Sequence, residues 1–159
     1  MADNRYLAIY LNDHLAGAIA GHELAKRAAG NNQGTPVGAF LSRLADEIDE
    51  DRSALEDLMG DLGIKKDLVK DAAAWMAEKV GRLKLNGKLV GYSDLSRLIE
   101  LEGLSLGVEG KVALWRNLNQ VADRYPELVT ADLEQLLRRA EKQREELEGF
   151  RQDAARVAL

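Results

Sequence analysis

Apolar side chains recur every three or four residues through four long segments of the chain, and short polar or glycine-rich stretches separate these segments. Such spacing gathers the apolar side chains on one face of a helix. We therefore predict four long amphipathic helices, over residues 4–29, 36–60, 93–124 and 130–157. At 1.5 Å per residue, each helix would be roughly 35–45 Å long. Helices of matched length, each with one apolar face, pack as a bundle.

The segment boundaries carry the residues that begin and end helices. A glycine and amide run at 30–34 favours a turn after the first helix. Thr35 is suited to cap the second helix, because Pro36 then takes its first position. Ser93 is predicted to cap the third long helix, and Tyr125-Pro126 follows the end of that helix. Thr130 or the next residue is expected to open the last helix.

The lengths of the connections predict the topology. About five or six residues join the first two long helices, and a similar number joins the last two, so each pair should form an antiparallel hairpin. The roughly 30 residues from Gly60 to Tyr92 are long enough to cross the bundle. They contain a shorter amphipathic pattern, which predicts a crossover helix at about 67–82. The whole chain, 1–159, is expected to form one domain.

Composition narrows the class of protein. The chain has 46% apolar and 31% charged residues but only 5% aromatic ones, so its core must be aliphatic. The net charge of −5 argues against a general nucleic-acid-binding protein, which normally carries a basic surface. The absence of cysteine excludes disulfides and thiolate metal sites. Because no signal peptide and no run of 18 apolar residues is present, we expect a soluble, cytoplasmic protein.

Polar residues on the apolar faces are the candidates for chemistry. His14 and His22, the two histidines of the protein, fall on the apolar side of the first helix. Asp51 lies on the apolar face of the second helix, with Glu47 one turn earlier on its flank. A carboxylate there needs a cationic partner, a metal ion or access to water.

The last two long helices carry three further candidates. Glu102 and Glu109 are seven residues apart and therefore lie on one face of the third long helix. On the last helix Arg144 follows the apolar register of Leu137 and Ala140. We predict that Glu47, Asp51, Glu102, Glu109 and Arg144 form a buried polar network.

The order of the long helices, the crossover and the inward carboxylates together resemble the ferritin-like superfamily over essentially the whole chain. This resemblance implies a four-helix bundle with one long crossover. Metal-binding members carry a Glu on each of two helices and Glu-x-x-His on each of the other two. This chain departs from that motif, with Glu47-x-x-Glu50 on the second helix and Glu141-x-x-Arg144 on the last.

The departures favour a protein without a di-metal centre. Arginine does not ligate metals but pairs well with buried carboxylates. We therefore predict that Arg144 neutralises Asp51, Glu47 or Glu102 and that no cofactor is bound. The alternative is a mononuclear iron, manganese or zinc site, using His14 or His22 with Asp51 and Glu102.

Glycines stack on one face of two helices, where each costs about 1 kcal/mol relative to alanine. Close packing of the first helix against the third long helix would explain them. The alternative is a face that leaves room for a flat ligand or a partner helix. The glycines concerned are Gly17, Gly21, Gly103, Gly107 and Gly110.

The predicted crossover is basic. Between Lys65 and Lys88 the chain holds six lysines and Arg82 against three acidic residues, a local charge of +4. We expect this segment to cover one side of the bundle with its lysines in solvent. The alternative is contact with an anionic membrane or with the acidic face of another subunit.

These observations lead to two hypotheses. The first is a non-enzymatic, self-associating ferritin-like bundle with a salt-bridged interior. The second is a metal-binding or redox protein of that superfamily with an altered set of ligands.

Overall fold

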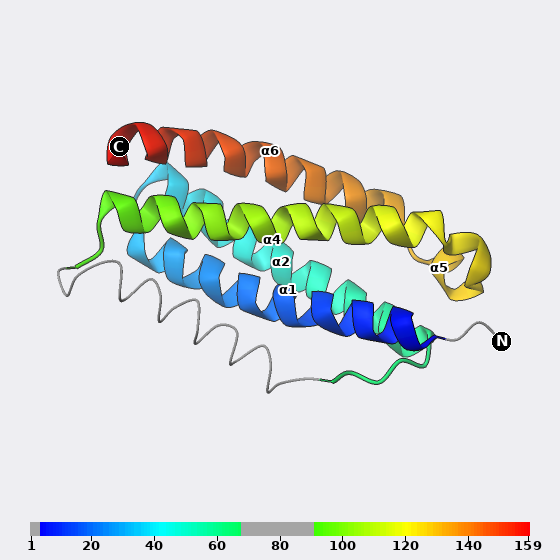
Figure 1. Cartoon of the computed structure of the whole chain (residues 1–159). Helices are drawn as coiled ribbons and strands as arrows, with labels where there is room; N and C mark the ends of the chain where they lie inside the picture. Colours follow the sequence, from blue (N-terminus) through cyan, green and yellow to red (C-terminus); the bar gives the residue numbers. More distant parts are fainter. Residues whose placement is uncertain (1–3, 68–90) are drawn as a thin grey trace.

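A computed structural model describes residues 4–67 and 91–159 of the protein. Within these ranges the chain forms the four long helices that the sequence predicts (Figure 1). Shorter helices η1 (Ala122–Arg124) and α5 (Pro126–Thr130) lie between the last two long ones. Residues 68–90 of the predicted crossover lie outside the described part. The long helices are α1 (Arg5–Asn31), α2 (Pro36–Asp61), α4 (Asp94–Gln120) and α6 (Leu133–Ala158).

Two antiparallel hairpins lie side by side in the bundle (Figure 1). Helix α1 pairs with α2, and α4 pairs with α6, whereas contact between the hairpins is mainly between α1 and α4. Helices α2 and α4 run in the same direction, and α1 and α6 run in the opposite one. The two predicted antiparallel hairpins are confirmed, but residues 121–132, with η1 and α5, join α4 to α6 instead of the five or six residues predicted. None of the described helices is long and apolar enough to cross a membrane.

Helix starts follow the predicted caps in two cases out of three. The Thr35 hydroxyl accepts a hydrogen bond from the Gly38 amide at 3.1 Å, and Pro36 opens α2. Ser93 and Ser96 form a reciprocal capping box at the start of α4. The predicted opening of the last helix at residue 130 is wrong. Pro126 starts the short helix α5 instead, and Asp132 caps α6 by accepting from the Gln135 amide.

The apolar core has two halves along the bundle. One half lies toward the α5 end, and the other lies toward the loop between α1 and α2. Both are mainly aliphatic, as the composition predicts. Fully or almost fully buried members of the first half include Leu11, Leu15, Leu55, Trp115 and Leu118. Those of the second include Ala25, Leu41, Leu44, Leu101 and Leu147.

The inward face of α6 differs by one residue from the predicted register. Gln143 is 3% exposed and follows Ala140 at a spacing of three, whereas Arg144 points outward and is half-buried. Spacings of three and four are both compatible with one helix face, so the pattern alone did not distinguish the two residues. Packing against α2 and α4 selects Gln143.

Candidate functional site

A buried ionic cluster joins three helices at the middle of the bundle. Asp51 of α2 is 2% exposed, and its Oδ2 atom lies 2.6 Å from Nζ of Lys111 of α4. Its Oδ1 atom accepts from Nε of Arg139 of α6 at 2.8 Å. Both carboxylate oxygens are therefore engaged by cations. We call this group, with Gln143, Glu47 and Glu50, the Asp51 cluster.

The amide of Gln143 completes the cluster. Its Nε2 atom donates to Glu47 at 2.8 Å, and its Oε1 atom accepts from Lys111. Arg139 also reaches Glu50 of α2 at 2.7 Å. Burial lowers the pKa of the Lys111 ammonium, opposed by the nearby Asp51 carboxylate. Burial acts to lower the pKa of Arg139, but the charges and hydrogen bonds of Asp51 and Glu50 together outweigh it, so this pKa is raised.

The predicted polar network of Glu47, Asp51, Glu102, Glu109 and Arg144 is therefore only partly correct. Asp51 and Glu47 belong to the cluster, but the cations are Lys111 and Arg139 rather than Arg144. The side chain of Arg144 pairs with Glu109 at 3.4 Å, where the Glu109 side chain is 59% exposed.

Glu102 is also at the surface, 3.8 Å from Arg151. The face of α4 that carries Glu102 and Glu109 points toward the outer edge of α6, because Leu101, Leu104 and Val108 take the inward positions.

A second polar cluster closes the end of the bundle near the α1–α2 loop. Asn32 is 2% exposed, and its side chain bonds to Tyr92 at 2.8 Å and to Arg97 at 2.6 Å. Tyr92 donates to Glu100, which also binds Arg27 of α1 at 3.1 Å. Burial, with Glu100 beside it, raises the pKa of Tyr92 to about 12, although the Asn32 hydrogen bond lowers it. We call these five residues the Asn32 cluster. None of them was predicted from sequence as a site residue.

The two predicted histidines lie in different surroundings. His14 packs edge-on against Tyr10, with ring centroids 4.5 Å apart, and burial lowers its pKa against the opposing effect of Asp13. His22 lies on the side of α1 that faces α2, where Nδ1 is 4.0 Å from an Asp49 oxygen.

The residues of the predicted mononuclear metal site are not brought together. Asp51 is engaged by two cations, and Glu102 lies on the outer face of α4. Over residues 4–67 and 91–159, no three His, Asp or Glu side chains form a group that could hold a metal ion.

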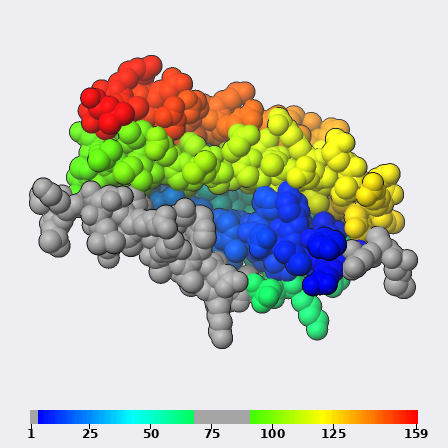
Figure 2. Space-filling model, viewed as in Figure 1, coloured from blue at the N-terminus to red at the C-terminus, as the bar shows by residue number. Residues whose placement is uncertain are grey.

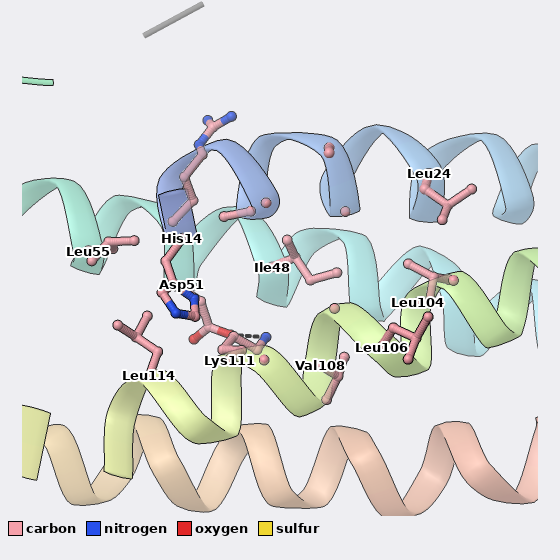
Figure 3. Close-up of a pocket in the computed structure, with 18 of the residues that line it drawn as sticks. His14, Leu24, Ile48, Asp51, Leu55, Leu104, Leu106, Val108, Lys111 and Leu114 are labelled. Atoms are coloured by element: carbon pink, nitrogen blue, oxygen red, sulfur yellow. Dashed lines mark hydrogen bonds and ion pairs between the residues drawn. The ribbon is translucent and has the colours of Figure 1, made fainter. Parts of the chain in front are cut away.

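An open groove of about 450 Å³ runs between α1 and α4, with α2 as its floor. Figure 2 shows the face of the molecule on which α4 and α1 lie side by side. The walls are mainly aliphatic, and the close-up places Leu24, Ile48, Leu104 and Val108 toward one end (Figure 3). Lys111 with Asp51, and also His14, lie toward the other end, where Leu55 and Leu114 flank them. We call this space the α1–α4 groove.

Three contacts define how α1 lies against α4. Arg27 meets Glu100 and Tyr10 meets Asn117 near the two ends, and Leu24 meets Gly103 between them. All three fit a single antiparallel register, so Gly17 is level with Gly110 and Gly21 with the turn that contains Gly107.

The predicted glycine face borders this groove. All five glycines line it. A Cβ atom added at Gly17, Gly21, Gly107 or Gly110 would meet no heavy atom within 4 Å in the described structure. Only at Gly103 would it touch a neighbour, a methyl of Leu24 at 3.2 Å. Close packing of the two helices therefore does not account for four of the five glycines. These four agree with the alternative, a helix face that leaves room.

Hydrogen-bond donors with unused capacity lie at one end of the groove. Trp115 lines the groove and is 1% exposed, and its indole Nε1 has no hydrogen-bond partner in the described structure. The imidazole of His14 likewise makes no hydrogen bond to any residue of 4–67 or 91–159. Lys111 has three N–H donors and uses two of them within the Asp51 cluster. This end of the groove is therefore rich in donors.

Comparison with known proteins gives no match. A scan against protein-family models and searches of curated proteins and solved structures found nothing similar to this chain. The site is thus interpreted from its own geometry.

Sequence reasoning missed Lys111, Arg139 and Gln143. Lys111 is three residues after the buried Val108, and Arg139 precedes the buried Ala140, so both border an apolar stripe. These positions beside inward residues, together with the need of Asp51 for a cationic partner, are the sequence signals that point to Lys111 and Arg139.

Proposed function

We propose that the protein is a non-enzymatic helical bundle of ferritin-like architecture that binds an apolar small molecule in the α1–α4 groove. The architecture is supported by the two hairpins and by the parallel course of α2 and α4 (Figure 1). Because these two helices are parallel, the long connection between them joins opposite ends of the bundle. One such long connection is a feature of ferritin-like folds.

The Asp51 cluster takes the place of a di-metal centre in this proposal. Ferritin-like metal proteins use inward carboxylates from several helices as ligands. Here the inward carboxylate of Asp51 is held by Lys111 and Arg139, and neither cation is a metal ligand. Protein purified from medium supplemented with iron, manganese and zinc should contain less than stoichiometric metal by elemental analysis. Stoichiometric metal that is lost in the Asp51→Asn variant would contradict this part of the proposal.

The observation that carries the binding function is the glycine-bordered groove. Its volume of about 450 Å³ falls in the range of roughly 300–1,000 Å³ that is typical of small-molecule sites. Its aliphatic walls favour an apolar ligand, because burial of apolar surface supplies about 25 cal/mol per Å². A glycine in a helix interior lowers the stability of the protein. Room for a ligand would explain why glycines occupy the open face at Gly17, Gly21, Gly107 and Gly110.

The test fills the groove without disturbing the fold. Gly107→Leu adds a side chain where a Cβ atom meets open space, so the variant should fold, and the new side chain should occupy the groove. Gly149→Leu is the matched control. Gly149 is also a helical glycine with open space around it, but it lies on α6 and does not line the groove.

The measurement uses N-phenylnaphthylamine, a neutral apolar dye whose fluorescence increases on leaving water. Wild-type protein and Gly149→Leu should bind the dye with equal affinity, and Gly107→Leu should bind it at least about tenfold more weakly. Circular dichroism checks that all three proteins are folded. Equal binding by Gly107→Leu, or no binding by folded wild-type protein, would refute the α1–α4 groove as the binding site.

A further inference from the structure

The chemistry of the donor-rich end of the groove says what kind of ligand it would hold. Trp115, His14 and Lys111 all line this part of the groove. Together they offer an indole N–H, an imidazole and one unused ammonium N–H. A buried indole N–H normally has an acceptor, and leaving it unpaired costs free energy.

Apart from the second ring nitrogen of His14, the acceptors at the same end are engaged by cations or lie at the rim. Both oxygens of Asp51 are taken by Lys111 and Arg139. Arg52 also lines the groove, but it is paired with Asp49 and Glu56. Asp13 is an exposed carboxylate at the rim, and its charge opposes the entry of an anion without forbidding a neutral acceptor. The end of the groove is therefore complementary to a group that accepts hydrogen bonds.

The shape of the groove restricts the rest of the ligand. The lining residues of α4 extend from Ile99 to Trp115, about 24 Å along the helix axis. Helix α1 follows the same axis in the antiparallel register, so the groove is long and narrow rather than round. Its aliphatic section, which includes Leu24, Leu104 and Leu106, lies beyond the polar end (Figure 3).

We propose that the α1–α4 groove binds a single aliphatic chain that ends in an oxygen acceptor, with this head group at His14, Lys111 and Trp115. The inference rests on the proposed function and adds the class of ligand and its direction in the groove. The chain lies along the glycine faces of α1 and α4. The head group accepts hydrogen bonds from the indole N–H of Trp115, the imidazole of His14 and the unused ammonium N–H of Lys111, which have no partner within residues 4–67 and 91–159.

The binding test compares head groups on one chain length. Dodecanoate and methyl dodecanoate both end in acceptor oxygens, whereas dodecylammonium carries the same chain and only donors. Each is used below its critical micelle concentration to displace N-phenylnaphthylamine from the protein. Both acceptor ligands should bind at least about tenfold more tightly than dodecylammonium. Binding of the acid alone would identify a free fatty acid, and binding of the ester as well would extend the class to acyl lipids.

Two further measurements locate the head group. His14→Phe keeps an aromatic ring but removes the donor, so it should reduce the preference for acceptors by about three- to tenfold. His22→Phe is the matched control on the same helix, because His22 does not line the groove. In a Trp75→Phe background, Trp115 is the single tryptophan, and its emission should change on adding dodecanoate.

The outcomes separate this inference from the proposed function. If dodecylammonium binds as tightly as dodecanoate, or if His14→Phe leaves the preference unchanged, the head-group assignment is wrong, although the groove still binds apolar molecules. If the dye binds to wild-type protein and not to Gly107→Leu, but no aliphatic chain displaces it, only this inference fails. If neither dye nor chain binds, the proposed function fails with it.

Discussion

Helix α4 takes part in two contacts that differ in kind. Its contact with α6 is filled by aliphatic side chains, such as Leu101 and Leu147, and is bridged along its outer edge by ion pairs. These pairs are Arg116–Glu141, Arg144–Glu109 and Arg151–Glu102. Its contact with α1 is bridged near the ends, by Arg27–Glu100 and Tyr10–Asn117, and remains open between them.

The difference shows how one helix can both stabilise the fold and border a binding site. Leucines on the face toward α6 bury apolar surface and contribute free energy of folding. Glycines on the face toward α1 contribute no side chain, so the two backbones stay bridged at the ends while space remains in the middle. The Asp51 cluster lies where the two contacts meet, because Lys111 and Arg139 reach it from α4 and α6.

The largest loss of stability is expected when the Asp51 cluster is changed. Asp51→Asn removes the charge that compensates the buried Lys111 ammonium, and it should lower the free energy of unfolding by about 3–5 kcal/mol. Urea denaturation gives the change. Glu109→Gln is the control from the ion pairs on the outer edge, and it should cost less than about 1 kcal/mol because that pair is exposed. Similar losses for both variants would mean that the Asp51 cluster is not buried as described.

The next largest change in stability is expected at a buried leucine, in contrast to an exposed one. Leu147 is fully buried in the contact between α4 and α6, so Leu147→Ala should lower the free energy of unfolding by about 2–5 kcal/mol. Leu106 is 77% exposed at the rim of the groove, and Leu106→Ala should change stability by no more than about 0.5 kcal/mol. Thermal or urea unfolding measures both. A large loss for Leu106→Ala would show that this face of α4 is covered in solution.

A smaller effect of opposite sign is expected at the glycine face. Gly107→Ala should raise the free energy of unfolding by about 1 kcal/mol, because alanine favours the helix and its Cβ atom meets open space. Gly38→Ala should be destabilising instead. A Cβ atom there would lie 2.0 Å from the Asn32 carbonyl oxygen, far inside contact distance. If Gly107→Ala also destabilises, the glycine face is closely packed rather than open.

The smallest effect is a dependence on pH at the polar end of the groove. Burial lowers the pKa of His14 in the folded state, so the unfolded chain binds the proton more readily. The stabilisation is fully present above the unfolded pKa of about 6.5 and decreases as the pH falls through it toward the folded pKa. Between pH 7.5 and 5.5, wild-type protein should therefore lose more stability than His14→Phe. Parallel losses in the two proteins would mean that His14 is hydrated in the folded state.

The Asn32 cluster illustrates a limit of sequence patterns. Asn32 and Tyr92 are 60 residues apart and their side chains are hydrogen-bonded, yet neither stands out from its neighbours. Asn32 belongs to an amide-rich run that predicts a turn, and the turn is indeed there. The Asn32 side chain also links the end of α1 to the start of α4, and this role depends on how the two hairpins are arranged.

The local elements of this protein follow from residues that are close together in the chain. The apolar stripes gave the four long helices, and Thr35, Pro36 and Ser93 marked two of their starts, because helix propensity and capping depend on residues within a few positions of each other. Short connections likewise predict that consecutive helices are antiparallel. Asp51 was placed on an inward stripe, and the glycines were placed on one face.

Which side chains meet depends instead on tertiary packing. It selected Gln143 over Arg144 and assigned Lys111 and Arg139 to Asp51, because the rotation of each helix is set by packing against its neighbours. It also decided that the glycines border a groove. A missing side chain permits either close approach or open space, and the spacing of α1 from α4 determines which of the two occurs.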